Sequence, residues 1–207
     1  MTKNTTEQND KLTKNILIVG VGGQGTLLAS RILGAVFADC GHDVKVSEVH
    51  GMSQRGGSVV THVRYGKSVA SPIVEKGQAD VILAFEKLEA LRYVSFAAKD
   101  CLMIVNNQEL NPMPVIAGAT TYPQGIFEEI KRCGVEPIVI DAKQGAIKAG
   151  SAKAVNLVII GKFAKRSGIG KQIFVSAIKN LVPEKMLELN LKAFEAGYAC
   201  IPVADAK

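Results

Sequence analysis

The chain contains an apolar run followed directly by a glycine-rich segment, Ile16-Leu17-Ile18-Val19-Gly20-Val21-Gly22-Gly23-Gln24-Gly25. The first four residues of this stretch are aliphatic without alternation, which is typical of a strand buried on both faces of a parallel sheet. Glycines follow at the spacing Gly20-x-Gly22-x-x-Gly25, and from Thr26 the apolar residues recur at helical intervals. A glycine turn between a buried strand and a helix is the context in which this fingerprint binds a dinucleotide. We therefore expect a doubly wound, Rossmann-like α/β domain.

The glycines of this first loop have separate predicted roles. Gly20 would allow the tight turn, Gly22 would let a pyrophosphate approach the backbone, and Gly25 would let the helix pack closely on the strand. The N-terminus of the following helix offers free N–H groups and a positive dipole end to an anion. Gly23 and Gln24 complete this candidate cofactor-binding loop.

A second glycine-rich loop follows the next predicted strand, Val44–Val49. Glu48 near the end of that strand is compatible with the acidic partner of the fingerprint. Hydroxyl, amide and guanidinium donors lie here beside glycines that can form an anion nest, although an ordered surface turn with a salt-bridged arginine is the alternative. Successive strands of a parallel sheet end at one edge, so the two loops should be neighbours. The candidate cofactor-binding residues of this loop are His50, Gly51, Ser53, Gln54, Arg55, Gly56 and Gly57.

The remaining chain continues the α/β pattern. We predict a mobile tail over residues 1–14 and a single domain over residues 15–207. A turn at Gly66–Ser68 predicts a β-hairpin insertion that ends near Pro72. Residues 152–207 form a predicted helical extension on a mostly parallel sheet. The predicted strands are 16–19, 44–49, 59–65, 80–85, 101–105 and 138–140, and the predicted helices are 26–38, 88–98, 152–166, 171–181 and 184–199.

Composition limits the functions that are open to the chain. Its 207 residues are 47% hydrophobic and 21% charged, enough for about one domain with one core. The net charge of +6 allows an acidic partner, but no aromatic residues interleave with the cationic cluster around Lys162–Lys171, so we expect no nucleic-acid binding. No apolar run approaches the ~18 residues of a membrane span.

The cysteines and histidines point to no local chemistry. No pair of the four cysteines has CxxC spacing, which predicts no metal or cluster site and favours a reducing cytoplasm. His50 has no accompanying nucleophile, so we assign no catalytic residue.

The two loops together resemble the gamma-type domain of the 2-oxoacid:ferredoxin oxidoreductases. Ile16–Gly25 and Glu48–Ser58 carry the resemblance, with further matches at Ala79–Arg92 and Ala154–Lys165. Within this family the chain is most similar to the small (beta) subunits of the indolepyruvate ferredoxin oxidoreductases. The resemblance implies that a 2-oxoacid, such as an arylpyruvate, is decarboxylated on thiamine diphosphate with coenzyme A, giving an acyl-CoA and two electrons for ferredoxin.

The resemblance also implies a division of labour. The chain has neither a GDG…N motif for thiamine diphosphate and Mg²⁺ nor a CxxCxxC run for a [4Fe–4S] cluster, so these would lie on a larger partner subunit. The two loops would face the assembled enzyme, with coenzyme A as a candidate ligand at the shared site. This chain would be inactive alone, and its apolar C-terminal helices make self-association plausible.

Three other hypotheses fit the same residues. The fingerprint with Glu48 is compatible with an independent Rossmann-type nucleotide- or flavin-binding oxidoreductase. An adenylating enzyme of the ubiquitin-activating type also uses a GxGGxG turn, but paired CxxC zinc motifs are lacking. The basic residues would suit a non-enzymatic binding module.

Overall fold

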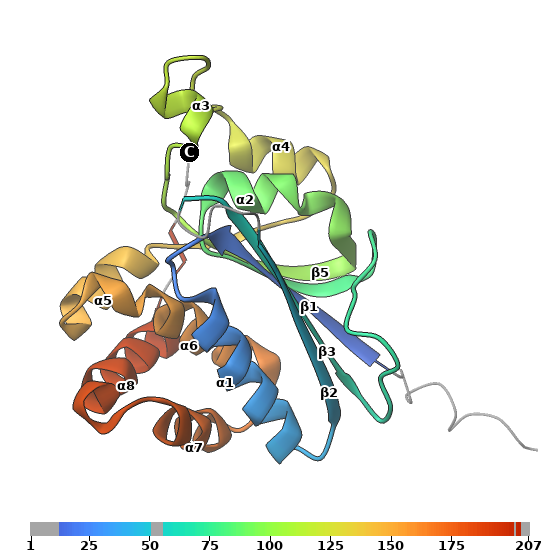
Figure 1. Cartoon of the computed structure of the whole chain (residues 1–207), viewed down its shortest axis with the longest axis vertical. Helices are drawn as coiled ribbons and strands as arrows, with labels where there is room; N and C mark the ends of the chain where they lie inside the picture. Colours follow the sequence, from blue (N-terminus) through green and yellow to red (C-terminus); the bar gives the residue numbers. More distant parts are fainter. Residues whose placement is uncertain (1–12, 51–55, 201, 204–207) are drawn as a thin grey trace, which may run out of the picture.

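The computed structural model describes residues 13–50, 56–200 and 202–203. Figure 1 shows one sheet between two helical layers, with strand order β2-β3-β1-β4-β5-β6. The strands are β1 (Thr13–Val21), β2 (Asp43–His50), β3 (Ser58–Gly66), β4 (Ala79–Ala84), β5 (Ala97–Asn106) and β6 (Ile138–Ile140). The helices are α1 (Thr26–Asp39), α2 (Lys87–Arg92), α3 (Met113–Ile116), α4 (Ile126–Arg132), α5 (Ala142–Ala149), α6 (Val155–Ser167), α7 (Lys171–Leu181) and α8 (Glu184–Ala199).

Alternation along β1 explains the two layers. Ile16 and Ile18 enter a core shared with α1, α5, α6, α7 and α8, whereas Leu17 and Val19 enter a core shared with α2 and α4. All four side chains are fully buried. A strand covered on both faces needs such a continuous apolar run, and the prediction of a doubly wound α/β domain is confirmed.

The C-terminal helices complete the larger of the two cores. Gly161 of α6 faces Gly197 of α8 at a close helix crossing. A Cβ at Gly161 would overlap the carbonyl oxygen of Phe194, and a Cβ at Gly197 would overlap that of Val158. The two backbones therefore touch where both glycines lie, and α6–α8 form part of the same layer as α1.

β3 forms a hairpin with β2, whereas the sequence predicted one with the residues after Gly66. β3 pairs antiparallel with β2, as in Val49↔Val60, and also antiparallel with β1, as in Val19↔Val60. The pairings of β4 with β1 and β5, and of β5 with β6, are parallel. Because both edges of β3 are occupied, the residues after Gly66 have no edge to join. The expected hairpin across Gly66–Ser68 is wrong for this reason.

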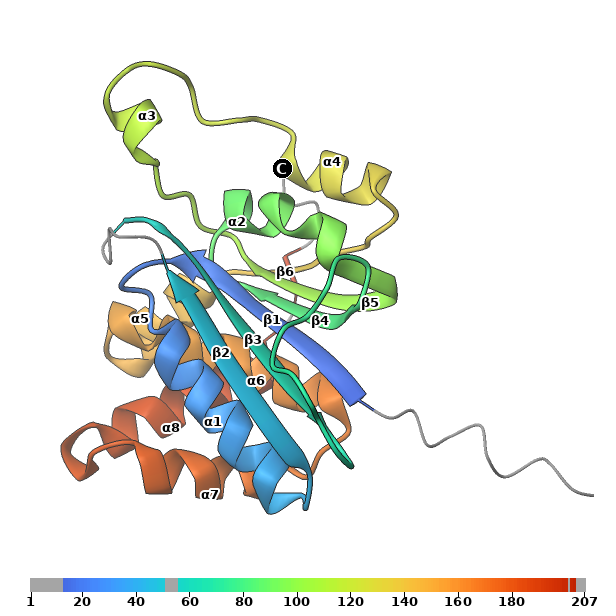
Figure 2. The same cartoon turned by 45° about the vertical axis from the view of Figure 1, so that its right-hand side comes forward.

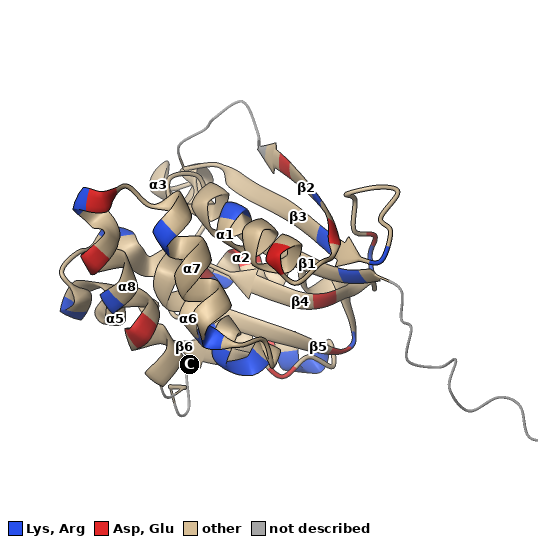
Figure 3. Cartoon of the chain, turned by 90° about the horizontal axis from the view of Figure 1, so that it is seen from below, with Lys and Arg blue, Asp and Glu red and all other residues tan. Residues whose placement is uncertain are grey.

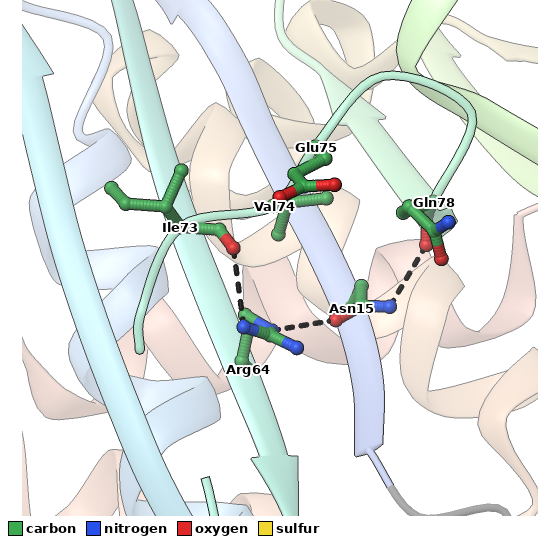
Figure 4. A pocket seen from close by; sticks show the side chains of 6 residues that line it. All are labelled: Asn15, Arg64, Ile73, Val74, Glu75 and Gln78. Carbon is green, nitrogen blue, oxygen red and sulfur yellow. Dashed lines mark hydrogen bonds between the residues drawn. The ribbon is translucent and has the colours of Figure 1, made fainter. Parts of the chain in front are cut away.

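Arg64 holds the segment after Gly66 against the sheet (Figure 4). Its Nη1 donates to the carbonyl oxygens of Ser71 and Ile73 at 2.8 and 3.2 Å, and its Nε donates to Oδ1 of Asn15 at 2.8 Å. His62 accepts a hydrogen bond from the backbone N–H of Val74 at 3.1 Å. The small pocket beside Arg64, about 290 Å³, is therefore part of a structural anchor.

Two predicted boundaries also move. Thr13 and Lys14 already belong to β1, where Lys14 Nζ lies 3.0 Å from Asp80 Oδ1. The helix predicted over 88–98 ends at Arg92. A 3-10 turn at Val94–Phe96 then lets Ala97 pair with Ala79, so β5 begins earlier than its sequence pattern indicates.

Candidate functional site

The two glycine-rich loops meet directly. The N–H of Gly22 donates to the carbonyl oxygen of Gly57 at 2.9 Å, and the N–H of Gly56 approaches the carbonyl oxygen of Gly22 at 3.4 Å. The two loops are neighbours, as expected. The contact arises because the antiparallel strand β3 begins beside the end of β1, with Val21 opposite Ser58. The predicted residues Gly51, Ser53, Gln54 and Arg55 lie outside the described residues, and His50 is described only as backbone of β2.

A pocket of about 470 Å³ opens beside the first loop at the N-terminus of α1. Gly25 caps this helix in the left-handed conformation, with φ of 84°, and no acidic residue occupies the first turn. The N-terminal N–H groups and the helix dipole favour an anion here. The carboxylate of Glu48 on the same pocket suits hydroxyl donors. The lining consists of Gly22, Gly23, Gly25, Thr26, Leu27, Glu48 and Val59.

Gln24 is committed to the loop itself. Its Oε1 accepts from the N–H of Val21 at 2.8 Å, and its Nε2 donates to the carbonyl oxygen of Phe85 at 3.0 Å. Gly20 makes this possible, because a Cβ there would lie 2.9 Å from Gln24 Oε1 and 3.0 Å from Phe85 Cβ. Gly20 thus lies within β1 and leaves room for the amide, whereas the sequence predicted that it forms the tight turn.

Gly25 packs on a helix that is distant in sequence. A Cβ at Gly25 would lie 2.8 Å from Nδ2 of Asn156, at the start of α6. That Nδ2 donates to the carbonyl oxygen of Gly25 at 3.3 Å. The close approach that the structure has at Gly25 is therefore to α6, whereas the sequence predicted one between the helix and its own strand. Asn156 is a supporting residue that the pattern did not reveal.

A buried carboxylate on α2 accepts a hydrogen bond from the residue that follows Gly57 of the second loop. Glu89 of α2 is 2% exposed; its Oε2 accepts from Ser58 Oγ at 2.5 Å and its Oε1 from Arg92 Nη1 at 2.7 Å. Burial raises the pKa of Glu89 above its usual value, although the hydrogen bond from Ser58 and the Arg92 charge oppose this. The site prediction omitted Glu89, although it lies in the Ala79–Arg92 segment that carries part of the family resemblance.

A second buried carboxylate, Glu86, caps α2 and fastens the segment after β5. It is 1% exposed, and its Oε2 accepts from the N–H of Glu89 at 2.9 Å. Its Oε1 accepts from the N–H of Leu110 at 3.1 Å and from the hydroxyl of Tyr122 at 2.5 Å. Burial and this carboxylate raise the pKa of Tyr122. The polar groups on α2 therefore position both the second loop and the chain after β5.

The predicted basic cluster is largely committed within the C-terminal helices. Lys162 Nζ donates to the carbonyl oxygen of Cys200 at 2.7 Å, and burial lowers its pKa. Lys165 and Lys171 place their ammonium groups 5.0 and 4.8 Å from the ring centroid of Tyr198. Figure 3 shows Lys and Arg interspersed with Asp and Glu over α5–α8. These contacts do not favour a dedicated binding face.

Neither a metal centre nor a membrane-spanning helix is found among the residues that the structure describes. These residues contain no group of three or more His, Cys, Asp or Glu side chains placed to hold a metal ion. None of the described helices combines the length and the apolar character that crossing a bilayer requires.

Residues 15–200 match the family described as pyruvate ferredoxin/flavodoxin oxidoreductase. The chain belongs to this family. Its relatives in the family include the indolepyruvate oxidoreductase subunit IorB of Pyrococcus horikoshii, which is 42% identical over 190 residues, covering 88% of this chain and 93% of that protein. IorB of Thermococcus kodakarensis is 40% identical with the same coverage of both chains.

A solved structure shows the same fold. The 2-oxoglutarate:ferredoxin oxidoreductase from Magnetococcus marinus, with 2-oxoglutarate, coenzyme A and succinyl-CoA bound, superposes with a TM-score of 0.69 at 20% identity, covering 91% of this chain and 31% of that chain. The family match and these relatives confirm the predicted resemblance. They favour a subunit of a 2-oxoacid oxidoreductase over an independent nucleotide-binding enzyme.

Proposed function

We propose that the chain is the small subunit of a heteromeric 2-oxoacid:ferredoxin oxidoreductase that converts indolepyruvate or a related arylpyruvate to an acyl-CoA. The observation that carries this proposal is the family match over residues 15–200 together with the IorB relatives. The larger subunit would hold thiamine diphosphate, Mg²⁺ and the [4Fe–4S] clusters and would pass electrons to ferredoxin. The proposed compartment is the cytoplasm, where exposed thiols such as those of Cys40 and Cys133 stay reduced.

The pocket at α1 is the proposed place where this chain contacts coenzyme A. Its chemistry fits the ligand, because the helix N-terminus would bind phosphate oxygens and Glu48 would accept hydrogen bonds from hydroxyl groups. When bound, coenzyme A supplies the thiol that takes up the acyl group. The residues of this chain would hold and orient the nucleotide end, and catalysis would belong to the larger subunit.

Reconstitution tests the assignment. The purified chain, the larger subunit and their mixture are assayed for ferredoxin reduction that depends on an arylpyruvate and coenzyme A. We expect activity only in the mixture. Activity of this chain alone, or the absence of a complex with the larger subunit, would contradict the proposal.

A charge placed in the pocket tests the coenzyme A contact separately. Leu27 is 47% exposed and lines the pocket, so Leu27→Glu adds a negative charge beside the proposed phosphate site without disturbing the core. We expect the KM for coenzyme A to rise by roughly tenfold while the KM for the 2-oxoacid stays unchanged. Leu181→Glu on α7, which is 37% exposed and does not line the pocket, is the matched control. Equal KM values for coenzyme A in the two variants would place the ligand elsewhere.

A further inference from the structure

A projecting segment between β5 and α4 has no part in the proposed chemistry. We call residues 110–121 the arm; it carries α3 (Figure 2). Every one of its residues is exposed or half-buried. Met113 and Ile116 are 68% and 65% exposed, more than any other large hydrophobic side chain in the described part of the chain. Two apolar side chains on α3 are thus exposed on a projecting segment.

The arm is fastened at its base. The N–H of Leu110, the first residue of the arm, and the hydroxyl of Tyr122, which directly follows the arm, both donate to the same oxygen, Oε1 of the buried Glu86. Within the arm, the N–H of Ala117 closes the single helical turn on the carbonyl oxygen of Met113 at 2.8 Å. The fold therefore presents Met113 and Ile116 outward from a defined support. Apolar surface held in this way costs free energy unless a partner covers it.

The sequence of the arm indicates the chemistry of that partner. Between Glu109 and Glu128 there is no charged residue, although 21% of the whole chain is charged. The cores of protein interfaces are depleted of charge and enriched in methionine. A neutral apolar arm therefore fits a neutral apolar groove, and it does not fit the acidic partner that the net charge of +6 alone would attract.

We propose that the arm docks into an apolar groove of the larger oxidoreductase subunit, an inference that rests on the proposed function. The arm follows the carboxyl end of β5, and the first glycine loop follows the carboxyl end of β1. Both strands pair with β4 in parallel, so β1 and β5 run in the same direction. Both features therefore lie at one edge of the sheet. A subunit that reaches the pocket at α1 can cover the arm as well, whereas a second copy of this chain would need no such proximity.

Single substitutions at the arm test the proposal in the complex. We expect Ile116→Asp and Met113→Asp each to weaken the binding of the larger subunit by at least about tenfold, because a charge would enter a desolvated apolar contact. The melting temperature of the isolated chain should change by less than about 2 °C, since both side chains are exposed. Ile147→Asp on α5, where Ile147 is 49% exposed, is the matched control and should bind like the wild type. Ile116→Val should also retain binding.

The outcomes separate this inference from the proposed function. Failure of the wild-type chain to bind the larger subunit would overturn the function, and with it the identity of the partner. If the wild-type chain binds the larger subunit and the Ile116→Asp and Met113→Asp variants bind it equally well, only the proposal that the arm docks there is overturned. Equal weakening by Ile147→Asp would do the same, because the effect would not be specific to the arm. If the wild-type chain alone forms a dimer that Ile116→Asp dissociates, the occupant is a second copy and the proposal is wrong.

Discussion

The N–H of Gly22 donates to the carbonyl oxygen of Gly57 at 2.9 Å, and this hydrogen bond joins the two glycine-rich loops at a residue, Gly22, that lines the pocket. Gly22 belongs to the loop that opens α1, while Gly57 leads into β3. Glu48 reaches the same pocket from β2. The site is thus built by the hairpin of β2 and β3 against the unit of β1, the first loop and α1. Glu89 of α2 accepts a hydrogen bond from Ser58 at the start of β3.

Gly25→Ala should destabilise the chain more than Gly23→Ala. Both glycines have positive φ, 84° and 102°, so each alanine should cost roughly 1–2 kcal/mol of backbone strain. Only at Gly25 would the new Cβ also press against Asn156, whereas nothing lies within 4 Å at Gly23. Urea denaturation of the two variants measures the difference in the free energy of unfolding. Equal losses would show that the Gly25–Asn156 approach has no energetic weight.

Gly161→Ala should lower stability although alanine is the better helix former. Propensity alone favours alanine by about 1 kcal/mol, but its Cβ would overlap the backbone of α8, which should cost about 3 kcal/mol or more. Gly34→Ala in α1 is the control, because its Cβ meets only Val46 at 3.8 Å and should stabilise the chain by about 0.5–1 kcal/mol. Thermal denaturation should move the two melting temperatures in opposite directions. A rise for Gly161→Ala would exclude the close crossing.

Tyr122→Phe should loosen the base of the arm. The substitution removes the hydrogen bond to Glu86 and the one that the hydroxyl accepts from the N–H of Leu88 at 3.2 Å. We expect a loss of about 1–3 kcal/mol in unfolding free energy, because the buried Glu86 loses a partner. Limited proteolysis should cut the arm faster. Tyr93→Phe is the control, since the described residues provide no hydrogen bond to that hydroxyl, and a similar loss there would make the effect non-specific.

Glu89→Gln should change how stability depends on pH. Burial raises the pKa of Glu89 above its usual 4.5, so the folded state holds its proton after the unfolded state has lost it. The contribution of Glu89 to stability therefore falls as the pH rises from about 4.5 through the folded pKa. The melting temperature of Glu89→Gln relative to the wild type should rise between pH 4 and 8.

Glu188→Gln is the control of opposite sign. Lys192 lowers the pKa of Glu188 below 4.5, so the stabilising contribution of Glu188 is present above that value and is lost as the pH falls through the folded pKa. This variant should therefore lose stability relative to the wild type as the pH rises toward 4.5, and the difference should stay constant from there to pH 8. Parallel pH profiles of the Glu89 and Glu188 variants would contradict the assignment of a raised pKa to Glu89.

Arg55→Ala tests the part of the second loop that lies outside the described residues. If the guanidinium binds a phosphate or carboxylate, its removal should lower kcat/KM for coenzyme A in the reconstituted enzyme by about tenfold or more. The melting temperature should stay unchanged. Arg132→Ala on α4, where Arg132 pairs with Glu129 on an exposed surface, is the control and should remain active. Wild-type turnover of Arg55→Ala would show that the arginine does not serve the reaction.

Local pattern was sufficient for much of the fold. The apolar run before Gly20 predicted a strand buried on both faces, and the apolar spacing after Gly25 predicted α1. The helices over 171–181 and 184–199 have the predicted bounds. Each of these features depends on neighbours a few residues away, so the sequence carries them directly. The family resemblance likewise depends on short motifs.

Other features required the tertiary structure, because they depend on contacts between residues far apart in the chain. Local patterns in the sequence were enough to predict the α/β class, the two glycine loops and the family. The position of β3 between β1 and β2 follows from long-range pairing. Because β1 and β2 occupy the two edges of β3, the predicted hairpin cannot form. The hydrogen bonds from the Gln24 amide to the carbonyl oxygen of Phe85 and from the Ser58 hydroxyl to Glu89 also depend on the tertiary structure. Long-range pairing chose these partners, and no local spacing specifies them.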